Sequence, residues 1–544
     1  MPPSASPAAA QPIKTTRPMQ AVLILSALFF LARFTGLLQR LIMSALLPTE
    51  ATDAYTAAFR LPDLLNYLVA GGAISLTFIP IFTRSWSQGR EAEAWRFFST
   101  LISVMGLILI VLTALMMIWT GPLIAMFLPG LTAPEKVETF ELAVAMTRII
   151  LPAQLFFYLG GLLVGVLNSF KRFGATGWTS AINNLVAILA GVALLHVVGP
   201  IGFAWGILLG AFAGNFLLPY LAIQRGPQGQ RPNFTPRFAF GDPAVRRFFV
   251  LALPIMFGVS LPVVDQIVVS YFASSLPGGA LTHLENANRL MIAAQGVLGQ
   301  AAAVAAFPYL ASESAAGDYR AFSEFLRLGL RRLLFVTLPV SVLLILWAHP
   351  LTRLIYGYGR YEDPQKLHET AFTFALFSVG LFAWAGQGFL ARGFYALSDT
   401  RTPTIIGSVL TIAFLIPLCY AMAQLWGAVG LALSTTIGAA AYFTAILLFL
   451  NARLQKAPYS APIGLEKIGG TLLRTGLACA LMGLAGILAL RLTDGFFSDD
   501  KLGDLALIAW TGTVAVFVFV ASAAQFEIPE WIWLRDKIRR RRRA

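Results

Sequence analysis

Long apolar runs alternate with short polar loops along the chain from Met19 to Ala524. Each run reaches about eighteen residues or more, the length that a helix needs to cross a hydrocarbon core roughly 30 Å thick. A membrane β-barrel would instead show shorter segments of alternating polarity. The pattern therefore predicts an all-α integral membrane protein with about fourteen transmembrane helices. The predicted helices are 19–47, 53–83, 97–119, 138–170, 176–197, 201–223, 247–275, 283–311, 329–348, 367–397, 404–423, 427–451, 469–491 and 503–524.

Composition also places the chain in a lipid bilayer. Its residues are 57% hydrophobic and only 12% charged, and the mean hydropathy is +0.73. The net charge of +14 would suggest a nucleic-acid partner in a soluble protein. Here most basic residues lie in the predicted tails and in loops on one side, as the positive-inside rule requires. We therefore expect a multi-pass inner-membrane protein that contacts membrane lipids, with both termini in the cytosol and no nucleic-acid partner.

The first twelve predicted helices form two copies of a six-helix unit, offset by about 228 residues. Arg60-Leu61 followed by Pro80 corresponds to Arg289-Leu290 followed by Pro308, and the turn at Gly199 corresponds to a turn at Gly427. Six is an even number, so both copies have the same orientation and form parallel repeats. Such repeats predict two lobes with a cavity between them.

The repeat divides the chain into six parts. The predicted parts are a disordered cytosolic tail (1–18), an N-terminal lobe (19–225), a cytosolic linker (226–246), a C-terminal lobe (247–455), two additional helices (456–525) and a basic cytosolic tail (526–544).

Five arginines fall inside predicted helices. An arginine at the centre of a membrane helix costs roughly 2.5–3.5 kcal/mol on insertion scales, so these side chains should face protein or water. Arg60 and Arg289 occupy equivalent places in the two repeats, and Arg33 lies near mid-membrane, so we expect these three in the central cavity. Arg40 and Arg148 fit equally well as buried ion pairs or as side chains that reach the headgroups.

Asp53 lies at the start of the second predicted helix, seven residues before Arg60 and therefore on the same helix face. It could cap its own helix or pair with a cavity arginine. A cationic chamber with few acids suits an anionic substrate, and arginine makes paired hydrogen bonds to phosphate. The sequence therefore indicates a diphosphate ligand.

Residue types that hold metals or cofactors are scarce in this chain. Cys419 and Cys479 lie inside apolar runs, and the four histidines lie near predicted helix ends, which is typical of solvated loops. No phosphate-binding glycine loop follows any predicted helix, so ATP hydrolysis is not expected. We expect neither a metal nor a cofactor.

Several segments resemble the MurJ/MviN family of lipid II flippases. The resemblance spans nearly all predicted helices and is most specific after the tenth one. The segments are Thr52–Asp63 and Gly72–Pro80 in the second helix, Ala287–Pro308 in the eighth, and Arg392-Gly393-Phe394-Tyr395-Ala396-Leu397-Ser398-Asp399-Thr400-Arg401-Thr402-Pro403 after the tenth.

The resemblance implies the fold of the multidrug/oligosaccharidyl-lipid/polysaccharide exporter superfamily, with two lobes around a V-shaped cationic cavity. It implies a transporter rather than an enzyme. Its substrate would be lipid II, an undecaprenyl-diphosphate-linked peptidoglycan precursor, moved from the cytosolic to the periplasmic leaflet by alternating access. The last two helices would hold the polyprenyl tail.

The resemblance also carries site residues to this chain. Arg33, Arg60, Arg289 and Asp53 stand at positions that match the basic and acidic cavity residues of the family. Arg40 stands one place later than the family arginine of the first helix. A one-residue shift moves a side chain by about 100° around the helix axis, so Arg40 joins this set only if the helix is locally rotated.

Other readings stay open at this point. A related polysaccharide-lipid flippase or a multidrug exporter would have the same repeats and cavity. An enzyme acting on polyprenyl phosphates would need a carboxylate cluster, and Glu135, Glu138 and Glu141 look instead like a solvated helix face. A membrane potential, a proton or a cation could each drive transport, with Asp265 as a candidate coupling residue or a buried hydrogen-bonded carboxyl.

Overall fold

The structure is a computed structural model that describes residues 18–69, 77–170, 172–226, 234–239, 241–259, 261–493 and 495–543. Every regular element within these ranges is a helix, which confirms the all-α prediction. The predicted tail at 1–18 lies outside the described residues except for Pro18, where the first helix begins.

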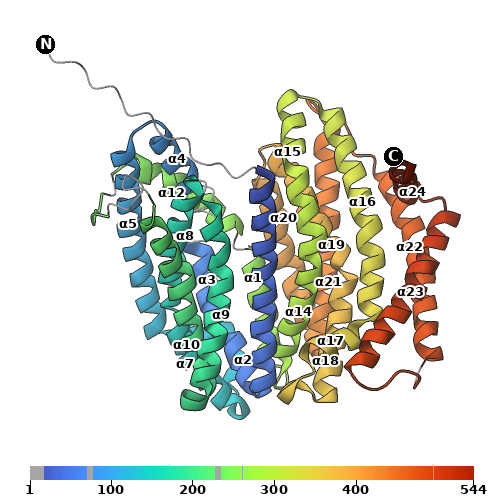
Figure 1. Ribbon diagram of the computed structural model, residues 1–544, viewed down its shortest axis with the longest axis horizontal. Coiled ribbons are helices and arrows are strands. Elements are labelled where there is room, and N and C mark those ends of the chain that lie inside the picture. Colours follow the sequence, from blue (N-terminus) through green and yellow to red (C-terminus); the bar gives the residue numbers. More distant parts are fainter. Residues whose placement is uncertain are drawn as a thin grey trace.

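The first half of the molecule comprises the helices before residue 225, which gather on one side of Figure 1 with α1 at their inner edge. These helices are α1 (Pro18–Leu46), α2 (Thr49–Ala58), α3 (Arg60–Val69), α4 (Ile79–Ser87), α5 (Glu91–Ile118), α6 (Thr120–Phe127), α7 (Val137–Ile150), α8 (Ala153–Ser169), α9 (Phe173–Val198), α10 (Gly202–Gly210), the π-helix η5 (Ala211–Leu217) and α11 (Leu218–Gln224).

The second half comprises the helices from α14 to α24, on the other side of Figure 1. α12 (Pro243–Val259) and α13 (Leu261–Ser274) connect the two halves. The helices of the second half are α14 (Ala280–Gln295), η7 (Gly296–Gln300), α15 (Ala301–Ala316), α16 (Tyr319–Leu346), α17 (Ala348–Tyr356), α18 (Pro364–Val379), α19 (Leu381–Ala396), α20 (Arg401–Leu410), η9 (Thr411–Leu415), α21 (Ile416–Gln455), α22 (Leu465–Leu492), α23 (Lys501–Gln525) and α24 (Pro529–Arg543).

Eight helical stretches of the described chain are long and apolar enough to cross a membrane, or nine if the pair α18 and α19, bent by 43°, counts as one span. Two of these stretches are long, Gly174–Gln224 with 51 residues and Arg401–Gln455 with 55. Each reverses direction at one of the predicted turns. Gly199 and Gly427 have positive φ angles of 65° and 57° there, which glycine adopts without a steric penalty. Ser434 Oγ accordingly donates to the carbonyl of Leu418, 3.3 Å away in the preceding segment.

One predicted span is broken in the structure. The pattern predicts a single helix over 53–83, whereas α2 ends at Ala58 and α3 begins at Arg60. Pro62 has no N–H to donate to the carbonyl of Ala58, and its ring crowds that carbonyl. The proline therefore accounts for the break, which places Arg60 on the first turn of a separate helix.

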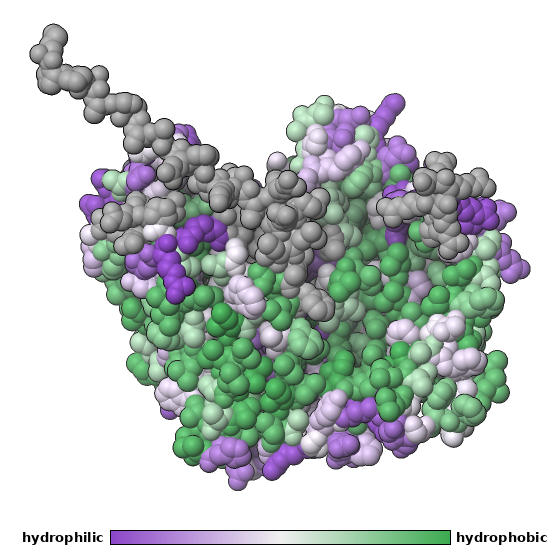
Figure 2. Space-filling view, viewed as in Figure 1, coloured by the Kyte–Doolittle hydropathy of each residue, from purple (hydrophilic) through white to green (hydrophobic). Residues whose placement is uncertain are grey.

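The outer surface matches a bilayer. Figure 2 shows apolar side chains over the middle of the visible face and polar side chains at its two ends. Large apolar residues exposed on the outer surface include Ile110 on α5, Leu189 on α9 and Leu484 on α22. A contiguous apolar surface of this kind would drive aggregation in water. The chain is therefore a multi-pass membrane protein.

The two halves are joined at one end of the molecule, here named the closed end. Ala54, Ala57 and Leu61 of the first half pack in one buried cluster with Leu281 and Leu284 of α14. α1 also contacts α17 near this end. In Figure 1 the closed end lies at the bottom, where the labels of α2, α17 and α18 are found.

The connecting helices attach to opposite halves. Phe248 of α12 is buried with Phe97 of α5, and their ring centroids lie 6.5 Å apart. The backbone N–H groups of Thr235 and Arg237 donate to Ser99 and Ser103 of α5, at 3.3 and 3.0 Å. α13 instead packs mainly along α21 in the second half. The predicted helix 247–275 is thus two helices with different partners.

Close helix packing in the first half generates a stability prediction. A Cβ atom at Gly206 of α10 would lie 2.4 Å from the carbonyl oxygen of Ala187 on α9, which is backbone and cannot rotate away. Gly206→Ala should therefore destabilise the protein by about 1–3 kcal/mol and lower its melting temperature in detergent. Gly106→Ala is the matched control, because a Cβ there meets nothing within 4 Å. An equal melting temperature for both variants would contradict the packing described.

Candidate functional site

Asp53 links the two halves at the closed end. It is 5% exposed. Its Oδ2 accepts a hydrogen bond from the N–H of Gly279 at 2.6 Å, and its Oδ1 accepts from the N–H and the Oγ1 of Thr282 at 2.8 and 2.6 Å. Asp53 is therefore the N-terminal cap of α14, a helix about 230 residues away in sequence. A carboxylate at a helix N-terminus satisfies orphan N–H groups and is favoured by the helix dipole.

Arg40 joins three helices next to this cap. It is 4% exposed. Its Nε donates to Asn286 Oδ1 of α14 at 2.7 Å, and its Nη2 donates to Thr56 Oγ1 of α2 at 2.9 Å. Asn286 in turn donates to Ser44 of α1 at 3.4 Å. Arg40 thus faces protein, and its described hydrogen bonds hold the closed end together.

Arg60 and Arg289 converge on one carboxylate. Arg60 Nη2, from the first half, lies 3.4 Å from Glu285 Oε2, and Arg289 Nε lies 2.9 Å from Glu285 Oε1. The side chains of Arg60 and Glu285 are 10% and 16% exposed, whereas that of Arg289 is 45% exposed. Arg60 Nε is buried and has no hydrogen-bond partner among the described residues. Arg60, Arg289 and Glu285 together therefore carry one excess positive charge, and Arg60 Nε is left as an unused donor.

Arg33 stands apart from the other three arginines. It is exposed on α1, two turns and about 10 Å along the helix from Arg40. It makes no hydrogen bond or ion pair with another residue of the described chain. The structure thus brings Arg40, Arg60, Arg289 and Asp53 to α14 and leaves Arg33 outside that set.

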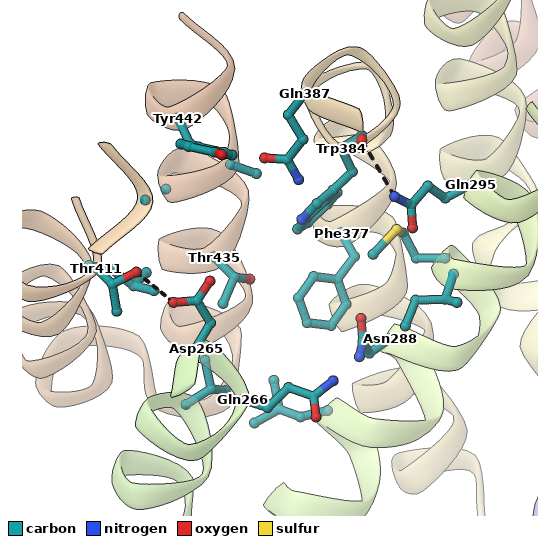
Figure 3. A pocket seen from close by; sticks show the side chains of 18 of the residues that line it. Asp265, Gln266, Asn288, Gln295, Phe377, Trp384, Gln387, Thr411, Thr435 and Tyr442 are labelled. Carbon is teal, nitrogen blue, oxygen red and sulfur yellow. Dashed lines mark hydrogen bonds between the residues drawn. The ribbon is translucent and has the colours of Figure 1, made fainter. Parts of the chain in front are cut away.

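A cavity of about 530 Å³ extends from Arg60 and Glu285 into the second half. Figure 3 shows its walls, with Asp265 and Thr411 on one side and Phe377, Trp384 and Gln295 on the other. Asp265 Oδ1 accepts a hydrogen bond from Thr411 Oγ1 at 2.7 Å. Among the described residues, no group of three or more His, Cys, Asp or Glu side chains is placed to hold a metal ion.

Two parts of this arrangement were not identified from the sequence. Glu285, the shared partner of the arginines, is signalled only by its spacing of four residues from Arg289 on a helix. His283 was expected in a solvated loop, but it is 4% exposed. Its Nδ1 lies 2.7 Å from the hydroxyl of Tyr361 and 2.8 Å from that of Thr370. The expectation fails for His283 because its helix end is covered by α18.

The segment after α19 has a structural role at the opposite end of the molecule. Asp399 accepts hydrogen bonds from the N–H groups of Arg401 and Thr402 at 3.1 and 3.0 Å, so it caps α20. It is also paired with Arg453 of α21. Partial burial would raise the pKa of Asp399, but the hydrogen bonds from Thr402 and the charge of Arg453 hold this pKa below its ordinary value.

Comparisons with known proteins agree with this geometry. The family model described as lipid II flippase MurJ matches residues 42–502. A lipid II flippase MurJ from Burkholderia cenocepacia is 30% identical over 472 residues, covering 85% of this chain and 90% of that protein. The family match favours a lipid II flippase over the multidrug-exporter reading of the sequence.

Solved structures support the fold. A structure described as lipid II flippase MurJ in an inward closed conformation has a TM-score of 0.73 and 21% sequence identity, covering 95% of this chain and all of that one. An inward-facing multidrug resistance MATE family transporter of the MOP superfamily has a TM-score of 0.66 and 15% identity, covering 80% of this chain and 98% of that one. The chain therefore has the fold predicted from the resemblance.

The cap on α14 generates a prediction about the closed end. Asp53→Ala removes the acceptor for three hydrogen bonds, and the loss of a cap costs about 0.5–2 kcal/mol. We expect the ratio of open to closed molecules at this end to rise about tenfold, the factor that corresponds to 1.4 kcal/mol. The measurement is the distance distribution between spin labels at Val137→Cys and Phe372→Cys, which lie on α7 and α18.

The matched control for this measurement is Asp265→Asn, because Asp265 is another intramembrane carboxylate that is bonded within its own half. Asp265→Asn should leave the distance distribution unchanged. If Asp53→Ala also leaves it unchanged, Asp53 does not hold the halves together.

Proposed function

The chain belongs to the MurJ family of lipid II flippases, and we propose that Arg60 and Arg289 hold the diphosphate of lipid II between the two halves during transport. The observation that carries the proposal is the convergence of these arginines, one from each half, on the single carboxylate of Glu285. A diphosphate offers the same kind of acceptor with more charge, so it can replace Glu285 as the partner of both guanidinium groups.

Two features of the arginines support a ligand role. The buried Nε of Arg60 has no hydrogen-bond partner among the described residues, and a buried donor without a partner costs about 1–3 kcal/mol, more for a charged group. Arg289 is 45% exposed and so can be reached by a ligand. Arg40 and Asp53 then contribute to binding indirectly, because they position α14. Arg33 is available to a ligand that enters along α1.

We propose alternating access as the mechanism. The closed end faces the periplasm, so lipid II enters from the cytosolic side. A ligand shifts an equilibrium between two states only by its differential affinity for them. A diphosphate gripped by arginines of both halves supplies such a difference, and its competition with Glu285 loosens the contacts that α14 makes with α3.

The proposed topology has fourteen passes through the cytoplasmic membrane, in which the MurJ family resides. The reversals at Gly199 and Gly427 turn two long helical stretches into four passes. An even number puts both termini on one side, and the basic end Arg539–Arg543 favours the cytosol. We assign the N-terminal lobe to 19–225, the linker to 226–246 and the C-terminal lobe to 247–455, with α12 packed on the N-terminal lobe.

We assign the polyprenyl tail of the substrate to α22 and α23, within residues 456–525. Exposed leucines on α22 recur at intervals of three to four residues and form one apolar stripe. The stripe consists of Leu473, Leu477, Leu481, Leu484 and Leu488. An isoprenoid chain is compatible with such a surface because neither partner has polar groups to satisfy.

The arginine clamp is tested by substitution of Arg289. Arg289→Ala should abolish lipid II exposure on the outer leaflet in cells depleted of their own flippase. Arg289→Lys keeps the charge but loses the paired geometry, so it should reduce exposure about tenfold or more. Arg148→Ala is the matched control, because Arg148 is an exposed intramembrane arginine on α7 that does not pair with Glu285. Normal exposure with Arg289→Ala, at normal protein level, would remove the clamp.

The topology has a separate test. A protease-sensitive tag after Ala544 should be cut only when protease is added to inside-out vesicles, because about 1 kcal/mol per basic residue holds the tail at the cytosolic surface. Cleavage in intact spheroplasts would contradict the assignment of both termini.

A further inference from the structure

Four side-chain amides line the same cavity as Arg60. Gln266 comes from α13, Asn288 and Gln295 from α14, and Gln387 from α19. We name this region the amide pocket. Gln295 Nε2 lies 3.4 Å from the carbonyl oxygen of Trp384, whereas the other three amides make no hydrogen bond with another described residue. Each amide offers both donors and an acceptor, so the pocket presents mixed, unused hydrogen-bonding capacity.

Aromatic rings form one wall of the amide pocket. Figure 3 shows Trp384 and Phe377 together on the wall opposite Asp265 and Thr435, with Gln387 and Tyr442 at one end and Gln266 and Asn288 at the other. The rings of Phe377 and Trp384 meet edge to face, 6.1 Å between centroids. A ligand in this space therefore has aromatic contact on one side and amides at its edges.

The lining excludes two other classes of ligand. An apolar chain would leave the amides unpaired, at about 1–3 kcal/mol for each buried group. A second phosphate would find no arginine other than Arg60 among the lining residues, and the carboxylates of Asp265 and Glu285 would repel it. What fits is a neutral ligand that has many hydroxyl or amide groups and apolar C–H faces.

We propose that the amide pocket binds the amino sugars of the lipid II headgroup. Sugar hydroxyls and N-acetyl groups pair with side-chain amides, and the C–H face of a pyranose ring packs on an aromatic ring such as Trp384. The inference rests on the proposed function, because the first sugar of lipid II is bonded directly to the diphosphate. The same cavity is lined by Arg60 and by the four amides. Its volume of about 530 Å³ lies within the range of roughly 300–1,000 Å³ found for small-molecule sites.

A sugar subsite gives the flippase a means to distinguish the loaded carrier from the bare one. Undecaprenyl diphosphate carries the phosphates but no sugar, so it engages the arginines and leaves the amide pocket empty. Discrimination between two ligands is a difference of affinities. In this proposal, lipid II binds more tightly than undecaprenyl diphosphate because residues of the amide pocket, which contact no phosphate, bind its sugars.

Binding of two lipids to the purified full chain tests the proposal. Lipid II should bind at least tenfold more tightly than undecaprenyl diphosphate. Trp384→Ala and Gln387→Leu should reduce this ratio to about one while leaving the Kd for undecaprenyl diphosphate within twofold of its original value. Gln387→Leu keeps the side-chain volume, so it reports on hydrogen bonding if Trp384→Ala fails to fold. Trp426→Ala is the matched control, because Trp426 is 56% exposed and lies outside the cavity lining.

The outcomes separate the sugar subsite from the arginine clamp. Arg289→Ala should weaken binding of both lipids by the same factor, and failure to weaken either one overturns the clamp. An unchanged ratio in Gln387→Leu, or an equal loss for both lipids, overturns the sugar subsite. A lipid II that lacks its stem peptide should bind like the intact lipid. If the tenfold preference disappears with the peptide, the amide pocket recognises the peptide and the proposal is wrong.

Discussion

The structure depends on the neutralisation of charge inside apolar helices, and α14 is where this takes place. Isolated charges in a membrane interior cost several kcal/mol each, so they persist only where partners surround them. The N-terminus of α14 receives the carboxylate of Asp53, its second turn carries Glu285 between Arg60 and Arg289, and Asn286 receives Arg40. One helix of the second half thus provides a partner for four charges, and three of these belong to the first half.

Closure and the arginine site are consequently parts of one arrangement. Asp53 and Arg60 lie on neighbouring helices, α2 and α3, and both make contact with α14. Any movement of α14 away from the first half breaks the cap at Gly279 and separates Arg60 from Glu285 together. Arg60 then needs another anion, because an unpaired guanidinium group is costly in this environment, whereas Arg289 keeps Glu285 on its own helix. A ligand with phosphate groups therefore bears directly on the contacts that keep the closed end shut.

The sequence predicts the helices well and the contacts between them only in part. The apolar runs locate the helical segments to within about ten residues, as for the prediction 329–348 and the helix Tyr319–Leu346, and the reversals at Gly199 and Gly427 follow from the repeat. Helix breaks such as the one before Arg60 are hidden, because Pro62 lies within an otherwise apolar run. The equivalence of Arg60 and Arg289 in the repeats singles out two arginines that the structure brings together on Glu285. The helical period, however, contains no information about which residue lies opposite them. Asp53 as the cap of α14 and Glu285 as the shared carboxylate both depend on pairings between residues 225 or more positions apart, and they emerge only from the folded structure.

The connection through α12 and α13 limits how the halves can move. α12 is buried against α5. The segment before α12 is also held on α5, because the N–H groups of Thr235 and Arg237 donate to serines of that helix. α12 is therefore expected to move with the first half. α13 packs on α21 and carries Asp265 and Gln266 into the cavity of the second half. Packed helices slide or rotate as units because their interfaces do not deform continuously. Opening of the closed end therefore changes how α12 and α13 lie relative to one another, and a rotation of α13 would carry one wall of the cavity with it. The shape of the cavity and the separation of the halves are thereby coupled through α13, which lines the cavity and also connects the two halves.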